Sequence, residues 1–96
     1  MEDMINKIIN KMFNENWNGE STTKDLESMK KQLNKNLNDQ TEGYWSGSKA
    51  YYIMTKGGFL IDGKNSTKKK LTELGKIFMN NYKRDYHKSK GVYLND

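Results

Sequence analysis

The sequence of 96 residues contains no cysteine and no long run of apolar residues. Without cysteine, the chain has neither a disulfide framework nor a zinc site built on thiolates. Without a stretch of about 20 apolar residues, it has no candidate membrane-spanning helix. Its first residues also lack the basic and apolar regions of a secretory signal peptide. A chain of 96 residues fits one domain, and these absences predict a cytoplasmic protein with no membrane association.

The residue types and spacings of catalytic sites are also scarce. His87 is the single histidine, and the sequence places no serine or carboxylate to pair with it. Residues 58–65 come near the phosphate-binding pattern G-x-x-x-x-G-K-[ST], but Asn65 stands where the metal-binding hydroxyl belongs. That loop would also have to include residues 59–61, which are typical of a strand. We therefore expect no enzyme activity, no cofactor and no metal site.

Positive charge is concentrated in the last third of the chain. Residues 1–62 carry a net charge of −1 and residues 63–90 carry +7, whereas the whole chain carries +5. A basic excess confined to one segment favours a polyanionic partner. The alternative interpretation is a solvated, lysine-rich surface.

Apolar residues make up only 33% of the chain, but they recur with the period of a helix in segments 2–13, 23–37 and 73–88. Two threonines mark helix starts: Thr22 opens a capping-box sequence and Thr72 precedes the last helix. Three amphipathic helices cannot bury their apolar faces alone, so we expect them to pack around one core. We expect Trp17, which follows the first helix, to fold back onto that core.

Residues 44–56 leave two structures open. The aromatic and β-branched residues at 51–53 favour a strand. A helix from Ser48 to Lys56 fits as well, with Ser48 as its N-cap and Gly57 just after its end. That helix would bury three of its residues, Ala50, Ile53 and Met54.

Residues 59–62 and 67–71 predict a two-stranded antiparallel hairpin. From residue 58 to residue 78, the chain resembles the wing of winged helix-turn-helix regulators of the MarR and PadR type. Those proteins carry a glycine followed by an apolar strand, a basic tip, and a second strand that runs into L-T-x-x-G and a long helix. The matching residues here are Leu71-Thr72-Glu73-Leu74-Gly75, in which Gly75 would let the last helix pack closely.

Short YjcQ-type winged-helix proteins of low-GC bacteria and their phages are similar in length and in the order of their elements. The resemblance implies a mainly α (α+β) fold, a winged helix-turn-helix with three or four helices and one β-hairpin wing. Residues 1–96 would form this single domain, with residues 91–96 as a disordered tail.

The resemblance further implies a non-enzymatic, DNA-binding regulator from a phage or mobile element, compatible with a homodimer. The helix at 48–56 would enter the major groove of duplex DNA, and the wing would contact phosphates. The expected DNA-binding residues are Ser48, Lys49, Tyr52 and Lys56 in the helix and Lys64, Lys68, Lys69 and Lys70 in the wing. The single arginine, Arg84, lies outside both elements, so bidentate arginine–guanine contacts are absent from them. Lysine contacts favour affinity over sequence discrimination.

A second hypothesis is a small phage protein that binds and inhibits a host protein, such as a nucleic-acid-processing or defence complex, without binding DNA itself. It rests on the small size of the chain and on four aromatic residues, Tyr44, Trp45, Tyr51 and Tyr52. Exposed tyrosine and tryptophan are typical anchors of protein interfaces. The same residues could instead fill the core.

Overall fold

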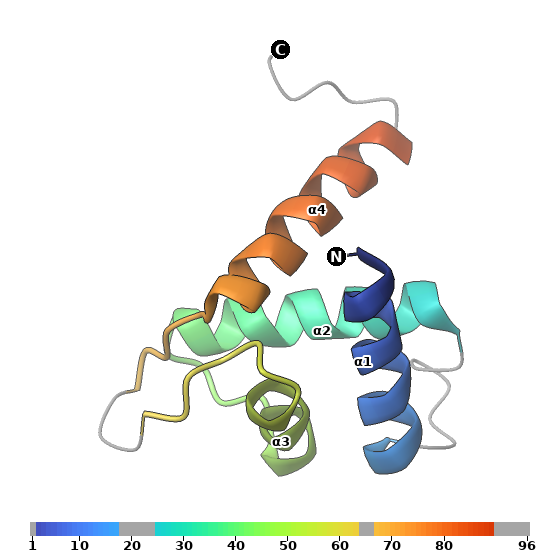
Figure 1. The fold of residues 1–96 in the computed structure, drawn as a ribbon. Helices are drawn as coiled ribbons and strands as arrows, with labels where there is room; N and C mark the ends of the chain where they lie inside the picture. Colours follow the sequence, from blue (N-terminus) through green and yellow to red (C-terminus); the bar gives the residue numbers. More distant parts are fainter. Residues whose placement is uncertain (1, 18–24, 64–66, 90–96) are drawn as a thin grey trace.

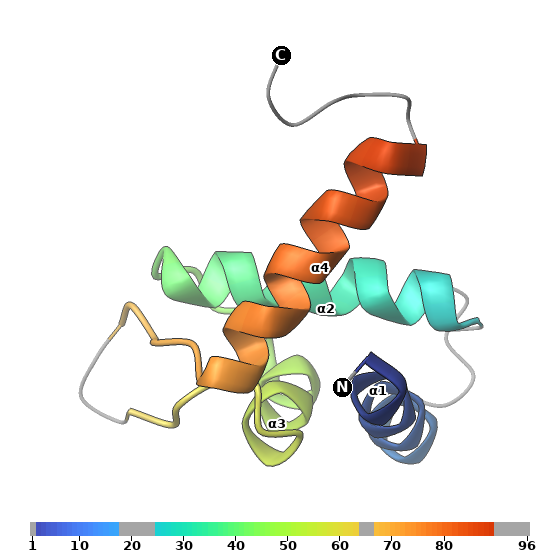
Figure 2. The same ribbon diagram turned by 45° about the horizontal axis from the view of Figure 1, so that its top comes forward.

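The computed structural model describes residues 2–17, 25–63 and 67–89. Within them, the chain forms helices α1 (Glu2–Asn16), α2 (Leu26–Thr41), α3 (Ser48–Lys56) and α4 (Glu73–Ser89). The other three helices all pack against α2, which runs through the middle of the molecule (Figure 1). Turned by 45°, the molecule shows α4 crossing α2 at a steep angle (Figure 2). The described residues contain no strand or sheet, so helices alone build the core.

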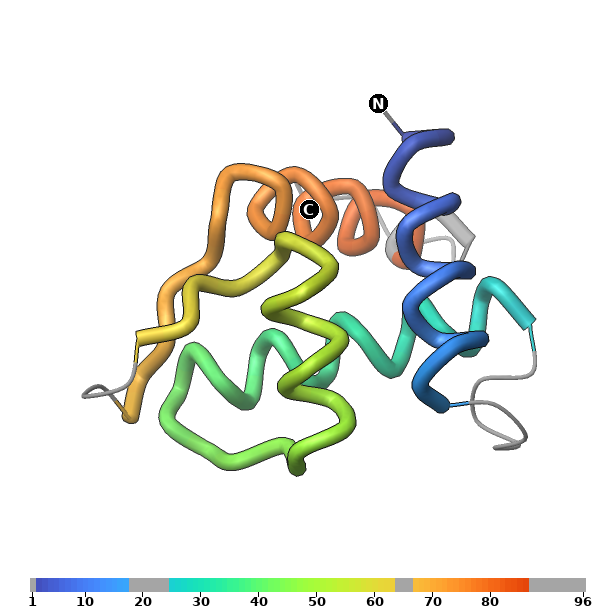
Figure 3. Tube along the Cα trace, turned by 60° about the horizontal axis from the view of Figure 1, so that its bottom comes forward, coloured from blue at the N-terminus to red at the C-terminus, as the bar shows by residue number. Residues whose placement is uncertain are grey.

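The predicted β-hairpin at 59–71 is wrong, and with it the α+β winged-helix fold class. The two segments run side by side (Figure 3), but Leu60 and Leu71 form only one isolated antiparallel bridge. The pairing does not extend toward the loop tip, because the carbonyl of Ile61, which a ladder would pair with the N–H of Lys70, accepts the N–H of Gly63 instead (3.0 Å). The N–H of Lys69 donates to the carbonyl of Gln40 in α2 (2.9 Å), which ties residues 67–71 to that helix. Residues 67–71 therefore form a loop that is hydrogen-bonded to α2.

The three helices expected from the apolar period are present, with different ends. α1 continues to Asn16, and α2 runs to Thr41, four residues beyond its predicted end. α2 begins at Leu26 because the Asp25 carboxylate accepts the N–H of Ser28 (2.8 Å), which makes Asp25 the N-cap. Thr22, where we expected the start, lies outside the described residues, as do residues 91–96 of the expected tail.

Residues 48–56 are helical, which decides between the two structures that the sequence left open. The expected buried face of Ala50, Ile53 and Met54 is confirmed. The N-cap, however, is Gly47 and not Ser48. Gly47 has φ of +100°, a backbone conformation that favours glycine. Glycine backbone thus sets the start of α3, and no side chain caps its first turn.

The core lies where α1, α2 and α3 meet under the start of α4. Its largest fully buried side chains include Phe13 of α1, Leu33 of α2 and Phe59, which follows α3. Phe59 packs edge-on against Phe78 of α4, with ring centroids 5.9 Å apart. Trp17 stacks on Phe13 at 5.7 Å, so its expected return to the core is confirmed.

The start of α4 is joined tightly to the residues after α3. Thr72 caps α4 as expected, since its hydroxyl accepts the N–H of Gly75 (3.0 Å). The same hydroxyl donates to the carbonyl of Gly58 (2.6 Å), and the N–H of Thr72 donates to the carbonyl of Phe59 (3.0 Å). A Cβ atom on Gly75 would overlap the Phe59 carbonyl, which confirms that this glycine permits close packing.

Candidate nucleic-acid interface

The outer face of α3 is open to solvent, because the helix packs on α1 and α2 through its opposite face. Ser48, Tyr52 and Lys56 are all exposed there, and Tyr52 keeps 48% of its surface accessible. Lys49 is also exposed, but its Nζ lies 5.8 Å from the ring centroid of Trp17. This cation–π contact directs Lys49 toward the α1 side of α3.

Residues Thr67–Lys70, which we call the lysine segment, lie on the other side of α3. Lys68 and Lys70 are exposed, whereas Lys69 is partly buried. The ammonium group of Lys69 donates to the carbonyl of Gly63 and lies 5.7 Å from the Tyr51 ring centroid. Lys69 therefore joins the lysine segment to α3, a structural role that its position in a basic run does not reveal. The fourth expected lysine, Lys64, lies outside the described residues.

A second bond fixes the same junction. The hydroxyl of Tyr51 donates to Oδ1 of Asp62 at 2.5 Å. This hydrogen bond, with burial and the negative charge of Asp62 as lesser causes, raises the pKa of Tyr51 from 10.0 to about 12. Tyr51 is therefore neutral at physiological pH and holds the carboxylate of Asp62 beside α3.

The loop that leads into α3 is held by hydrogen bonds to residues of α2. Gln40 is 2% exposed, and its Oε1 accepts the N–H of Ser46 (2.8 Å). The Ser46 hydroxyl donates to the carbonyl of Asn36 (3.3 Å), and Asn36 is also buried. No pattern in the chain distinguishes these buried amides from surface ones.

Tyr44 and Trp45, in the same loop, are the most exposed large hydrophobic residues described, at 68% and 65%. The Trp45 ring lies 5.2 Å from that of Tyr51. Of the four aromatics that could have filled the core, these two face solvent and Tyr52 is half exposed, whereas Tyr51 is partly buried.

Comparison with known proteins finds no matching family model, no matching curated protein and no matching solved structure. The resemblance to winged helix-turn-helix regulators therefore stays a prediction from the sequence. In the part of the chain that the structure describes, no three histidine, cysteine or acidic residues group to hold a metal ion. Nor is any helix there long and apolar enough to cross a membrane.

Proposed function

We propose that the protein binds duplex DNA through one surface formed by the outer face of α3 and the lysine segment. The observation that carries the proposal is the junction at Tyr51, where the cation–π contact of Lys69 holds the lysine segment against α3. Lys49 lies two residues from Tyr51, about 200° away around the helix. The exposed face of α3, a helix of nine residues, is thus flanked by lysines on both sides.

This arrangement suits the division of roles common in DNA-binding proteins. Lysines at the edges contact phosphates and set the orientation of the protein, while side chains on the helix face the groove. α3 contains no acidic residue. The nearest carboxylates along the chain, Glu42 and Asp62, each lie six residues from an end of α3, and that of Asp62 is held by Tyr51. Since the helix offers Ser48, Tyr52 and Lys56 but no arginine, we expect strong non-specific binding and modest discrimination between sequences.

Salt dependence of binding to a labelled random duplex, measured by fluorescence anisotropy, tests the proposal. Contacts to about four phosphates give a slope near −3.6 in log affinity against log salt. Replacing the exposed Lys68 and Lys70 by alanine should reduce the steepness by up to about 1.8. The matched control replaces Lys7 and Lys11, which are exposed on α1, and should leave the slope near its original value. Equal effects of the two pairs of substitutions on the slope would mean that DNA binding depends on the net charge of the protein and not on this surface.

A second candidate function is inhibition of a host protein, which the exposure of Tyr44 and Trp45 supports. Two adjacent exposed aromatics are the residue types that most often anchor protein interfaces. Replacing both by alanine distinguishes the two functions. Loss of duplex binding, with the fold intact, would make the pair part of the DNA surface. Unchanged DNA binding, with loss of a biological effect in the host, would favour the protein partner.

A further inference from the structure

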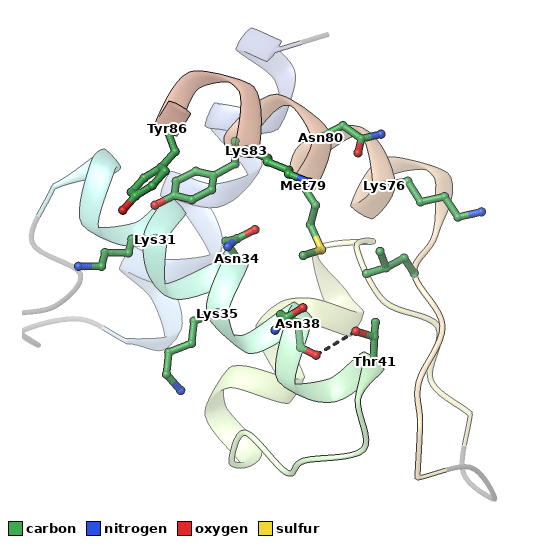
Figure 4. Close-up of a pocket in the computed structure, with 12 residues that line it drawn as sticks. Lys31, Asn34, Lys35, Asn38, Thr41, Lys76, Met79, Asn80, Lys83 and Tyr86 are labelled. Atoms are coloured by element: carbon green, nitrogen blue, oxygen red, sulfur yellow. Dashed lines mark hydrogen bonds between the residues drawn. The ribbon is translucent and has the colours of Figure 1, made fainter. Parts of the chain in front are cut away.

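A groove of about 940 Å³ lies between α2 and α4 and is open to solvent along one side (Figure 4). Its apolar lining comes from Leu71, Met79, Tyr82 and Tyr86. Figure 4 shows Met79 of α4 and Asn34 of α2 pointing into the space between the helices. No residue of α3 and none of the lysine segment lines the groove, so it is separate from the proposed DNA surface.

Both edges of the groove are basic. Its remaining lining residues are four lysines, three asparagines and one threonine: Lys31, Lys35, Lys76, Lys83, Asn34, Asn38, Asn80 and Thr41. No carboxylate is among the lining residues that the structure describes. Lys35 pairs with Asp39 at 3.0 Å and Lys76 with Glu73 at 3.5 Å, whereas Lys31 and Lys83 form no ion pair with another described residue. The groove therefore joins an apolar floor to cationic edges.

The size and shape of the groove favour an elongated ligand over a compact one. Along α2 it extends from Lys31 to Thr41, ten residues or about 15 Å of helix. Small-molecule pockets enclose most of their ligand, but this groove stays open along its length. The rings of Tyr82 and Tyr86 stack on each other at 6.3 Å, and Phe78 stacks on Tyr82 at 6.0 Å. Because these ring faces already have partners, a platform for stacked bases is less favoured than a floor for aliphatic side chains.

We propose that this groove binds an acidic amphipathic helix of a partner protein. About three turns of helix match its length. Apolar residues at positions i, i+3 or i+4, and i+7 of the partner would lie on Met79 and Tyr82, as in other helix-in-groove complexes. Acidic residues on both flanks of that stripe would face Lys31 on the α2 edge and Lys83 on the α4 edge. Charge complementarity thus fixes which kind of helix is accepted.

The probe is a fluorescein-labelled helical peptide of about four turns, with leucines along one stripe and glutamates on both flanks. Its binding is followed by fluorescence anisotropy. Lys31→Glu with Lys83→Glu should weaken binding at least about tenfold, because attraction becomes repulsion at both edges. Lys7→Glu with Lys11→Glu carries the same charge change on α1 and should bind the peptide as the unmodified protein does. Thermal unfolding without peptide verifies that both variants fold.

A second measurement works on the unmodified protein and needs no variant to fold. The methyl NMR signal of Met79 should shift when the peptide is added and should not shift with a scrambled peptide of equal composition. Equal binding of the scrambled peptide, or equal weakening by the α1 control, would overturn the proposal. So would a single-stranded oligonucleotide that moves the Met79 signal when the peptide does not. Variants in α3 should leave peptide binding unchanged, which separates this proposal from the DNA-binding one.

Discussion

Gly75→Ala should destabilise the protein, against the usual preference of helices for alanine. Gly75 is the third residue of α4. An added Cβ would overlap the carbonyl oxygen of Phe59, lie 3.1 Å from its carbonyl carbon and lie 3.4 Å from a methyl group of Leu71. The overlapped atoms are backbone and cannot rotate away, so the start of α4 has to move.

The magnitude follows from opposing contributions. Alanine in place of glycine in a helix gains at most about 1 kcal/mol. Forcing extra volume into a packed site costs about 1–3 kcal/mol. Moving α4 also strains the two hydrogen bonds that Thr72 makes to the carbonyls of Gly58 and Phe59, each of which contributes about 1 kcal/mol. We expect a net loss of about 2–4 kcal/mol in the free energy of unfolding.

Urea and thermal unfolding followed by circular dichroism measure this loss. For a domain of this size, about 1 kcal/mol lowers Tm by 4–8 °C, so Gly75→Ala should melt at least about 8 °C lower. Gly63→Ala is the matched control, because nothing lies within 4 Å of its added Cβ. It should stay within about 1 kcal/mol of the original. A Gly75→Ala variant as stable as the Gly63→Ala variant would refute the close approach of α4 to Phe59.

Two further predictions concern the supports of α3. Gln40→Leu should cost about 1–3 kcal/mol of stability, because the partly buried N–H of Ser46 loses its acceptor. In urea unfolding it should fall below Asn38→Leu, the same kind of change at an exposed position of α2, and equal stability of the two variants would contradict this bond. Tyr51 should ionise near pH 12, and Asp62→Asn should bring its pKa back toward 10.0, as followed by ultraviolet absorbance of tyrosinate. Because folding raises the pKa of Tyr51, the stabilisation that its hydrogen bond to Asp62 provides is complete below pH 10 and is lost as the pH rises through 12. An unchanged titration in Asp62→Asn would show that the hydrogen bond is not its cause.

Local signals in the sequence predicted the helices well and the hairpin badly. The apolar period indicated three helices, and Thr72 with Gly75 indicated how α4 begins. The residues at 59–61 have strand propensity, but a strand needs a partner along its whole length. Here the carbonyl of Ile61 accepts the N–H of Gly63 and not that of Lys70, and Lys69 bonds to Gln40 of α2. Nothing near Lys69 in the sequence reveals this long-range bond.

The candidate site was predicted in part for similar reasons. Ser48, Tyr52 and Lys56 share an exposed face because the buried face of α3 follows from its apolar period. The structural roles of Lys69 and Gln40 were missed, since both depend on contacts with distant segments. Residue type alone does not show that a lysine or a glutamine makes such contacts.

The central claim, that α3 faces DNA, is tested most directly at Ser48, the exposed first residue of this helix. Ser48→Glu places a negative charge at a helix N-terminus, where it should raise stability by about 0.3–1 kcal/mol. The same charge would face phosphates, so duplex affinity at low salt should fall about tenfold relative to the neutral Ser48→Gln. A more stable protein with weaker DNA binding is the predicted result. Equal duplex affinity of Ser48→Glu and Ser48→Gln would contradict the account.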